Sequence, residues 1–416
     1  MFSFFRDALA TARGSAPTPF MVFFVYVWAV WVLKALAARR YRPFAGEAPP
    51  LSVTVLVPVF REPEAVFRRS LASVVAENPF ELIAIVDGGD PAVAAVAAEY
   101  CTRVLRISKA GKRAAMAAGL AAACSSTEVV VVLDSDTVWA PGTLRELLRP
   151  FADPRVGGVT PRQAIFDVGD DPVRRLADWI EDLRYLVTVP AQSVFGQVGC
   201  LAGRTIAYRR SAFEPAVMTL VRQTVFGMPL SVGDDRVLTN ELLRSGWRTV
   251  YQSTALVWTD APGDWRTFWR QQLRWGRSSQ RETVLSLRWL WKRPVAGATF
   301  ATDILTPFAL YAVVALGIAH VMSGGGGRHG QALGVELLLA FAGMVVSIGV
   351  RQIPHLRRRP RDVLRLPLFA LQLTFVMVPI RILAFATMLH QSWSTRVLEP
   401  AYELPHEAVL AEPGHL

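Results

Sequence analysis

Apolar residues form long uninterrupted runs near both ends of the chain and only short runs in its middle. The first long run, from Phe20 to Ala37, contains a single charged residue, Lys34. As a helix this run would be about 27 Å long, close to the ~30 Å hydrocarbon core of a bilayer. Three similar runs follow at Ala296–Met322, Ala332–Val350 and Leu366–Leu389. The pattern predicts one membrane helix, a soluble domain and then three more membrane helices.

These runs set the expected boundaries of the parts. We expect transmembrane helices at 17–37, 296–322, 332–350 and 366–389. Between the first two lie an expected soluble domain at 49–260 and interfacial amphipathic helices at 261–295, and an acidic tail follows at 390–416.

Basic residues flank the apolar runs unevenly, and this asymmetry predicts orientation. The segment after the first run and the connector 351–365 are rich in arginine, whereas the connector between the second and third runs contains only Arg328. We therefore expect a multi-pass protein of the plasma membrane whose soluble domain is cytoplasmic. The alternative is that Ala35-Leu36-Ala37 is a signal-peptidase site. The length of the apolar run and the basic residues behind it disfavour cleavage.

Short apolar runs alternate with helical segments inside the soluble domain. The expected strands are Leu51–Val59, Leu82–Val86, Arg103–Ile107 and Val129–Leu133, and the expected helices are Glu64–Ala76, Pro91–Tyr100 and Ala114–Ala123. This alternation, with nearly continuous apolar strands, is typical of an α/β fold with a buried, mostly parallel sheet. Ligands of such sheets bind beyond the carboxyl ends of the strands. Polar residues that follow the strands are therefore candidates for a site.

Composition narrows the functional classes. The 416 residues are 52% hydrophobic and 19% charged, which excludes a disordered chain. Much of the net charge of +11 comes from arginines beside the apolar runs. Membrane orientation already explains those arginines, so no nucleic-acid partner is expected. Three widely spaced cysteines, Cys101, Cys124 and Cys200, argue against a disulfide framework or a zinc site.

Two strands end in short acidic motifs. Asp87 follows the second strand, and Asp134 and Asp136 follow the fourth in the sequence Asp-Ser-Asp. Two carboxylates at one strand end can converge on Mg²⁺ or Mn²⁺, with substrate phosphates completing the coordination. The alternative is that such acids only terminate strands and cap helices. The pair is harder to explain in that way than Asp87 alone.

Two further motifs adjoin helices. Lys112 lies in a glycine-containing basic turn that can hold phosphate at a helix N-terminus, although an isolated basic cluster is more often a solvated surface. Asp234 and Asp235 precede the expected helix 237–244, where a carboxylate can accept a proton from an attacking hydroxyl. Helix capping accounts for one of these two acids but not for both.

The segment 264–282 predicts an amphipathic helix with an arginine face and an aromatic face. At 100° per residue, five arginines fall within an arc of about 80°, namely Arg266, Arg270, Arg274, Arg277 and Arg281. The segment also contains Gln271 and Trp275. An interfacial anchor with snorkelling arginines explains it, and so does a guanidinium group directed at a diphosphate. One helix can do both.

Taken in order, the motifs VDGGD, GKR, DSDT, GDDRVLT and QQLRW resemble those of the membrane-integrated inverting family-two glycosyltransferases. Hyaluronan synthases and nodulation chitooligosaccharide synthases are the most similar. The resemblance covers about Val53 to Glu282 and implies a GT-A catalytic domain that uses a UDP-sugar and a divalent metal. Each motif alone is weak evidence, whereas five in order are specific.

The resemblance also implies roles for individual residues. It places Asp87 at the uridine and Lys112 beside the nucleotide. Asp134 and Asp136 would form the metal–diphosphate motif, and Asp235 would be the catalytic base. The residues implied at the diphosphate and at the acceptor are Arg274, Gln271, Trp275, Cys200, Gly203 and Arg204. Arg381, inside the last apolar run, fits a path by which a growing glycan leaves, or it is a snorkelling arginine.

One departure from the family pattern bears on specificity. The loop Gly199–Arg204 has arginine where the similar enzymes typically have proline after glycine. Sugar identity and product length therefore stay open. The leading hypothesis is a processive transferase that makes a β-linked glycan from UDP-GlcNAc, UDP-GlcA or UDP-Glc and exports it. The alternatives are addition of one sugar to a lipid acceptor, and a non-catalytic membrane transporter or scaffold.

Overall fold

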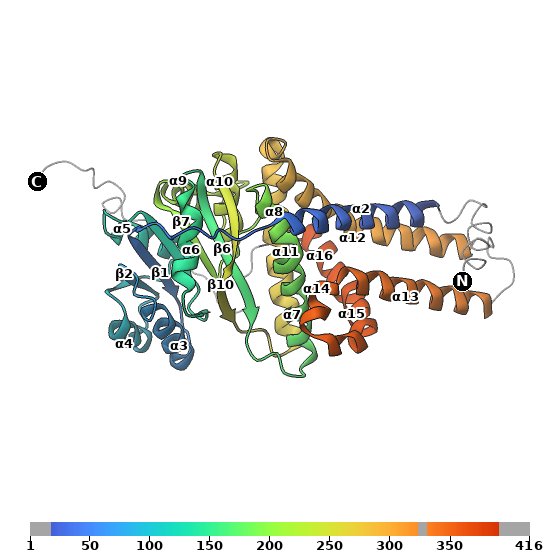
Figure 1. The fold of residues 1–416 in the computed structure, drawn as a ribbon, viewed down its shortest axis with the longest axis horizontal. Coiled ribbons are helices and arrows are strands. Elements are labelled where there is room, and N and C mark those ends of the chain that lie inside the picture. The colour runs from blue at the N-terminus through green and yellow to red at the C-terminus, as the bar shows by residue number, and fades with distance from the viewer. Residues whose placement is uncertain (1–17, 323–330, 391–416) are drawn as a thin grey trace, which may run out of the picture.

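The computed structural model describes residues 18–322 and 331–390. An α/β domain forms one end of the molecule, and long apolar helices extend from it (Figure 1). The acidic tail predicted at 390–416 lies outside the described residues except for His390.

One eight-stranded sheet organises the domain. Its strands are β1 (Val53–Val59), β2 (Glu81–Asp87), β3 (Arg103–Ile107), β4 (Val129–Leu133), β5 (Val138–Trp139), β6 (Val156–Ile165), β7 (Thr205–Arg209) and β10 (Arg248–Thr259). They lie in the order β3-β2-β1-β4-β7-β6-β10-β5. Strands β3, β2, β1 and β4 are parallel, as are β6 and β10, whereas β7 runs antiparallel to both of its neighbours. The predicted mostly parallel α/β sheet is confirmed.

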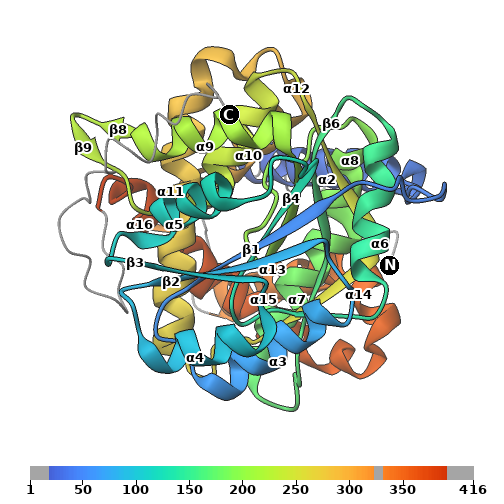
Figure 2. The ribbon, with the colours of Figure 1, turned by 90° about the vertical axis from the view of Figure 1, so that its left-hand side faces the viewer.

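Helices cover both faces of the sheet. They are α3 (Glu64–Val75), α4 (Pro91–Tyr100), α5 (Gly111–Ala122), α6 (Thr143–Leu148), α9 (Arg210–Arg222) and α10 (Asp234–Arg244), and a small hairpin of β8 (Thr224–Val225) and β9 (Met228–Pro229) joins the last two. Figure 2 shows α3 and α4 on one side of β1 and β2, and α5, α9 and α10 on the other. Alternate residues of β1 point to opposite faces of the sheet, each of which has its own hydrophobic core. Val55 and Val57 pack toward α3 and α4, and Leu56 packs toward α5. Burial of these strands on both faces explains their nearly continuous apolar sequence.

Local sequence explains where the first helices begin. Asp90 accepts hydrogen bonds from the N–H groups of Ala92 and Val93, with Pro91 in the first turn of α4. Helix α5 begins at Gly111, three residues before the predicted start. Gly111 has φ +84, a conformation that favours glycine, and Asp87 accepts the N–H groups of Ala110 and Gly111. A carboxylate that lies far away in sequence therefore fixes this helix end.

Close packing around Gly158 of β6 predicts a strong substitution effect. A Cβ at this position would lie 2.5 Å from Leu201 Cδ1 and 2.9 Å from Leu242 Cδ2. Gly158→Ala is expected to lower the free energy of unfolding by roughly 1–3 kcal/mol through overpacking, measured by thermal denaturation. Gly46→Ala is the matched control, because a Cβ there meets nothing within 4 Å. Equal midpoints for the two variants would contradict this packing.

Three helices connect the domain to the apolar region. Two of them, α7 (Pro172–Leu183) and α8 (Val189–Val194), form one rod through the π-helical stretch η2 (Arg184–Thr188). The third is α11 (Trp265–Leu290), which is capped by Asp264, whose carboxylate accepts the N–H of Thr267 at 2.9 Å. Sequence reasoning predicted α11 but not the rod.

The apolar helices α2 (Thr18–Arg40), α12 (Pro294–Met322) and α13 (Gln331–Arg351) extend together away from the domain (Figure 1). Among the described residues, three segments are long and apolar enough to cross a bilayer: Phe20–Arg40, Pro294–Leu316 and Pro360–Ala386. The side chains of α13 are described from Phe341 onward, so its described apolar stretch is shorter, Phe341–Arg351. The boundaries of the four spans stay a prediction.

The last apolar segment is interrupted and packs against the connecting helices. It consists of α15 (Leu366–Gln372), the π-helical stretch η4 (Leu373–Met377) and α16 (Val378–Ala386). The arginine-rich connector before it forms α14 (Ile353–Arg358) and the 3₁₀ turn η3 (Pro360–Arg365). Phe369 stacks on Trp179 of α7 with ring centroids 3.9 Å apart, and Ala384 lies against Gly276 of α11. Helix α16 packs against α12 and α15 packs against α13, close to the domain in Figure 1. This packing places the segment between the domain and the other apolar helices.

Candidate active site

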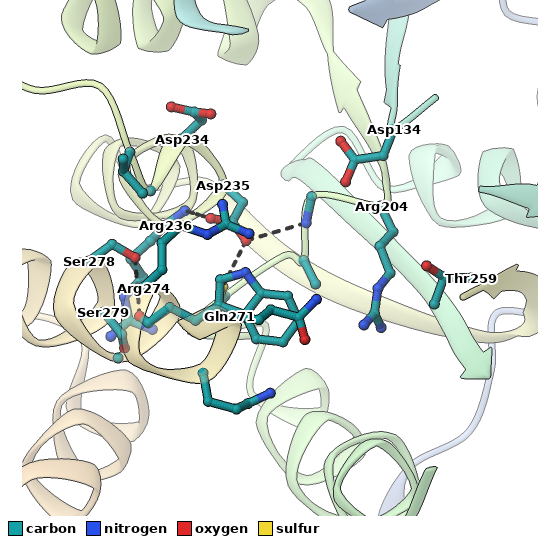
Figure 3. A pocket seen from close by; sticks show the side chains of 18 of the residues that line it. Asp134, Arg204, Asp234, Asp235, Arg236, Thr259, Gln271, Arg274, Ser278 and Ser279 are labelled. Carbon is teal, nitrogen blue, oxygen red and sulfur yellow. Dashed lines mark hydrogen bonds between the residues drawn. The ribbon is translucent and has the colours of Figure 1, made fainter. Parts of the chain in front are cut away.

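One cavity of about 730 Å³ lies where the domain meets the apolar helices. The ends of β1, β2 and β4, the loop before β7, the start of α10 and the middle of α11 all contribute to its wall. Every site residue predicted from the sequence lines it, as do Lys34, Asp303 and Arg381 of the apolar helices. Figure 3 shows the labelled side chains converging on this space. The fold thus brings together motifs that are almost 190 residues apart.

Asp134 and Asp136 stand side by side at the carboxyl end of β4. The ammonium group of Lys112 is bonded to Asp134. Burial, with the carboxylates of Asp134 and Glu62 nearby, raises the pKa of Asp136 to about 6. This crowding of negative charge is what a divalent cation relieves, and carboxylate oxygens are the ligands that Mg²⁺ and Mn²⁺ prefer. The residues present therefore fit the metal that the sequence predicted.

Asp87 and Lys112 adjoin this acidic pair. Besides lining the cavity, Asp87 accepts the Ala110 and Gly111 N–H groups at 2.7 and 2.9 Å. It therefore caps α5, so capping and a contact with the nucleotide are compatible for this residue. Burial alone would lower the pKa of Lys112, but the carboxylates of Asp134, Asp234 and Asp235 raise it overall. Lys112 is accordingly a fixed positive charge in the cavity.

The two acids that open α10 have different partners. Asp234 is buried and accepts a hydrogen bond from Arg113 Nε at 2.9 Å. Asp235 faces the cavity, where its Oδ2 accepts the Gly203 N–H at 3.3 Å and the Cys200 thiol at 3.7 Å (Figure 3). The helix cap itself is Gly233, with φ +94. Neither acid serves as the side-chain cap, and the second is the one presented to a substrate.

The loop Gly199–Arg204 forms the floor beneath Asp235. Burial and then the carboxylate of Asp235 raise the pKa of Cys200 to about 11, so the thiol keeps its proton and donates a hydrogen bond to Asp235. Phe300 of α12 packs so closely on Gly199 that a Cβ there would lie 2.6 Å from its ring. A helix of the apolar region therefore supports the loop that contacts the catalytic-base candidate.

The arginines of helix α11 lie in three different environments. Arg266 and Arg270 are exposed, Arg274 lines the cavity with Gln271 and Trp275, and Arg281 is buried and donates to the carbonyl of Val232 at 2.8 Å. The arginine face predicted from periodicity is therefore exposed near the start of α11, lines the cavity in the middle of the helix and is buried in the protein farther along it.

Several cavity residues had not been found from the sequence. Glu62 follows β1 and accepts a hydrogen bond from Ser135 Oγ at 2.8 Å, and the rule of inspecting each strand end would have found it. Arg184 lines the cavity, and Arg113 lies behind its wall, bonded to Asp234. Both have partners distant in sequence, for which no local signal exists. Asp303 carried a usable signal, since it is an acid inside an apolar run.

A separate group of acids and one histidine lies between α7 and α14. Asp178, Asp182 and His355 approach one another closely enough to hold a metal ion. Arginines already occupy this group, because Arg358 is bonded to Asp182 and Arg359 Nε lies 2.7 Å from Asp178. We assign it to joining α7 with α14.

Comparison with known proteins decides the family. The family model described as "Glycosyltransferase like family 2" matches residues 49–278, more than half of the chain. The chain belongs to this glycosyltransferase family. This confirms the resemblance predicted from the motifs and the expected enzyme class, a UDP-sugar-dependent glycosyltransferase.

Relatives of this glycosyltransferase match along most of its length. A hyaluronan synthase of Streptococcus pyogenes is 29% identical over 381 residues, covering 88% of each chain. An N-acetylglucosaminyltransferase of Rhizobium meliloti (strain 1021) is 29% identical over 396 residues, covering 90% of this chain and 91% of its own. One from Sinorhizobium fredii (strain NBRC 101917 / NGR234) is 29% identical over 383 residues. The similarity therefore includes the apolar helices as well as the catalytic domain.

Proposed function

We propose that this glycosyltransferase is a processive, inverting enzyme of the plasma membrane that polymerises a β-linked oligosaccharide or polysaccharide. The donor is a UDP-sugar of the GlcNAc, GlcA or Glc type, and catalysis takes place on the cytoplasmic face. One observation carries the proposal: a single cavity joins the strand-end acids to the apolar helices. The names of the relatives, a hyaluronan synthase and N-acetylglucosaminyltransferases, support it.

The donor half of the site lies at the ends of β2 and β4. In this proposal Asp87 contacts the uridine, Lys112 and Arg274 face the diphosphate, and Asp134 and Asp136 hold Mg²⁺ or Mn²⁺. The cation supplies positive charge at the departing diphosphate. Lys112 adds a second positive charge beside the metal site, because its ammonium group is bonded to Asp134. The crowding of carboxylates at the end of β4, which raises the pKa of Asp136, is the feature of the chain that most directly supports the metal.

The acceptor half lies between Asp235 and Trp275. Asp235 takes the proton from the attacking hydroxyl at Oδ2, the oxygen that faces the loop Gly199–Arg204. Cys200 and Gly203 orient this carboxylate by donating to it. Gln271, Trp275 and Arg204 form the surface against which an acceptor sugar lies. One base on one face of the donor sugar gives inversion, because the hydroxyl attacks opposite the departing diphosphate.

The far end of the cavity provides an exit for a growing glycan. Lys34 of α2, Asp303 of α12 and Arg381 of α16 line it. Ionisable residues in apolar helices face protein or water rather than lipid, so these three mark a polar route between the helices. Export through the bilayer follows from this route as part of the proposal. The partners are then a UDP-sugar, a glycan acceptor and the bilayer.

The same opening favours a second candidate function. A cavity that reaches helices of the bilayer also admits the head of a lipid acceptor, and single-sugar transfer to a lipid would use the same donor site and the same base. This candidate function uses the same donor-site, metal-site and acceptor-site residues as the first. It differs only in that Lys34, Asp303 and Arg381 would not line an exit route for a glycan.

A donor screen tests the proposed function. Purified protein in lipid nanodiscs is supplied with each UDP-sugar in turn and with Mg²⁺ or Mn²⁺, and released UDP is measured. We expect UDP release from at least one of UDP-GlcNAc, UDP-GlcA and UDP-Glc, abolished by a chelator and restored by either cation. UDP release that is insensitive to the chelator would contradict the metal assignment, and no release from any donor would contradict the function.

A further inference from the structure

Arg204 is the one residue of the acceptor loop that departs from the family pattern, and it lines the cavity. It ends the loop Gly199–Arg204, and its side chain extends into the space that Figure 3 shows. Only 13% of the side chain is exposed. A guanidinium group in such a position is held by the protein and is available to a ligand.

The contacts of Arg204 leave one edge of the guanidinium group open. Nη1 donates to Gln163 Oε1 at 3.0 Å and to Glu181 Oε1 at 2.8 Å. No described residue accepts a hydrogen bond from Nε or Nη2. These two nitrogens form the edge that binds a carboxylate or phosphate through two parallel hydrogen bonds. The protein therefore fixes the group from one side and presents its bidentate edge on the other.

The position of this edge matches the acceptor. The guanidinium carbon lies 5.8 Å from the centroid of the Trp275 ring, the flat surface on which a sugar can rest. The same loop donates to Asp235 through Gly203. A sugar that rests on Trp275 with its hydroxyl at Asp235 thus brings its substituents beside Arg204.

Charge and polarity around Arg204 suit an acidic sugar or sugar phosphate. Glu181 is paired with Arg204, and the nearby Arg184, which contacts the carbonyl of Cys200 at 3.5 Å, adds a second guanidinium group to this part of the cavity wall. Glu181 Oε2 is buried and lacks a hydrogen-bond donor among the described residues. A neutral acceptor would leave the open guanidinium edge unpaired, which costs binding free energy.

We propose that Arg204 determines acceptor specificity by binding an acidic group, a carboxylate or a phosphate, on the acceptor that rests on Trp275. This inference rests on the proposed function and extends it by naming the chemistry of the acceptor. A uronic acid at the end of a glycan and a lipid phosphate are the two sources of such a group.

Paired probes test the inference by binding and by turnover. The full chain in nanodiscs, with UDP present, is titrated by calorimetry with an oligosaccharide ending in a uronic acid and with its carboxyl-reduced form. A second pair is a short polyprenyl phosphate and the corresponding alcohol. We expect one acidic probe to bind roughly tenfold to a hundredfold more tightly than its neutral partner. The pair that shows this preference identifies the source of the acid.

Variants of Arg204 assign the preference to the guanidinium group. Arg204→Gln is expected to remove the preference for the acidic probe while the neutral probe and UDP bind as before. Arg204→Lys is expected to retain part of this preference. Glu181→Gln, which removes the competing carboxylate, should preserve it. Equal binding of acidic and neutral probes by the unmodified chain, or equal weakening of both by Arg204→Gln, overturns the inference. Absence of UDP release from every donor would instead count against the proposed function, because the binding comparison needs no turnover.

Discussion

Replacing Asp235 by asparagine is expected to lower the rate of UDP release in the presence of acceptor by about a thousandfold, the range associated with a general base. Asparagine keeps the shape of the side chain and an oxygen that accepts the Gly203 N–H, now 3.3 Å from Oδ2. It cannot accept a proton from the attacking hydroxyl. The loss should therefore appear in kcat, with UDP binding and the thermal midpoint preserved.

A neighbouring acid of the same helix provides the control for Asp235. Glu241 lies later in α10 and forms a salt bridge with Arg244 at 2.6 Å, away from the cavity. Glu241→Gln is expected to leave UDP release unchanged, since the pair that it breaks is at the surface. A similar loss in both variants would mean that the helix, rather than the carboxylate of Asp235, is what activity needs.

Removing the carboxylate of Asp136 should abolish metal-dependent turnover. Asp136→Ala takes away one of the two carboxylates at the end of β4, and a catalytic cation contributes several kcal/mol, which is about a hundredfold or more in rate. We expect loss of Mn²⁺ binding, followed by electron paramagnetic resonance, together with loss of Mn²⁺-stimulated UDP release. The variant should fold, because alanine relieves the buried crowding that raises the pKa of Asp136.

The opposite end of the same strand supplies the matched control. Glu128 precedes β4, is exposed and accepts the Ser52 N–H at 3.1 Å. Glu128→Gln should bind Mn²⁺ and turn over like the unmodified protein. Normal Mn²⁺ binding by Asp136→Ala would remove Asp136 from the metal site, even if its activity were lost.

The first half of the domain was predictable because its signals are local. Buried β-branched runs, the Asp90 cap and the alternation of strand with helix all lie within short windows of sequence. The second half was not predictable in the same way. Strand β7 inserts antiparallel between β4 and β6, and such pairings depend on contacts between distant residues. The rod of α7 and α8 was missed for a related reason. Its apolar residues pack against helices that are distant in sequence, such as α15, where Phe369 stacks on Trp179.

The residues of the candidate site also divide into those with a local sequence signal and those whose roles depend on distant contacts. Asp134 and Asp136 could be named from the sequence because strand ends are where acids converge on a ligand, whereas the family resemblance was needed to choose Asp235 over Asp234. Periodicity found the arginine face of α11 but could not separate exposed Arg270 from cavity-lining Arg274 and buried Arg281. Arg113 was not predictable as the partner of Asp234, because the pair spans 121 residues.

The size of the product tests the central claim most directly. Purified protein is incubated with its donor at low enzyme concentration, and products are separated by size at early times. Processive synthesis through the cavity predicts long chains while most acceptor is still unextended. Accumulation of a single-sugar adduct on lipid, with no longer product at any time, would contradict the claim and establish the single-transfer alternative.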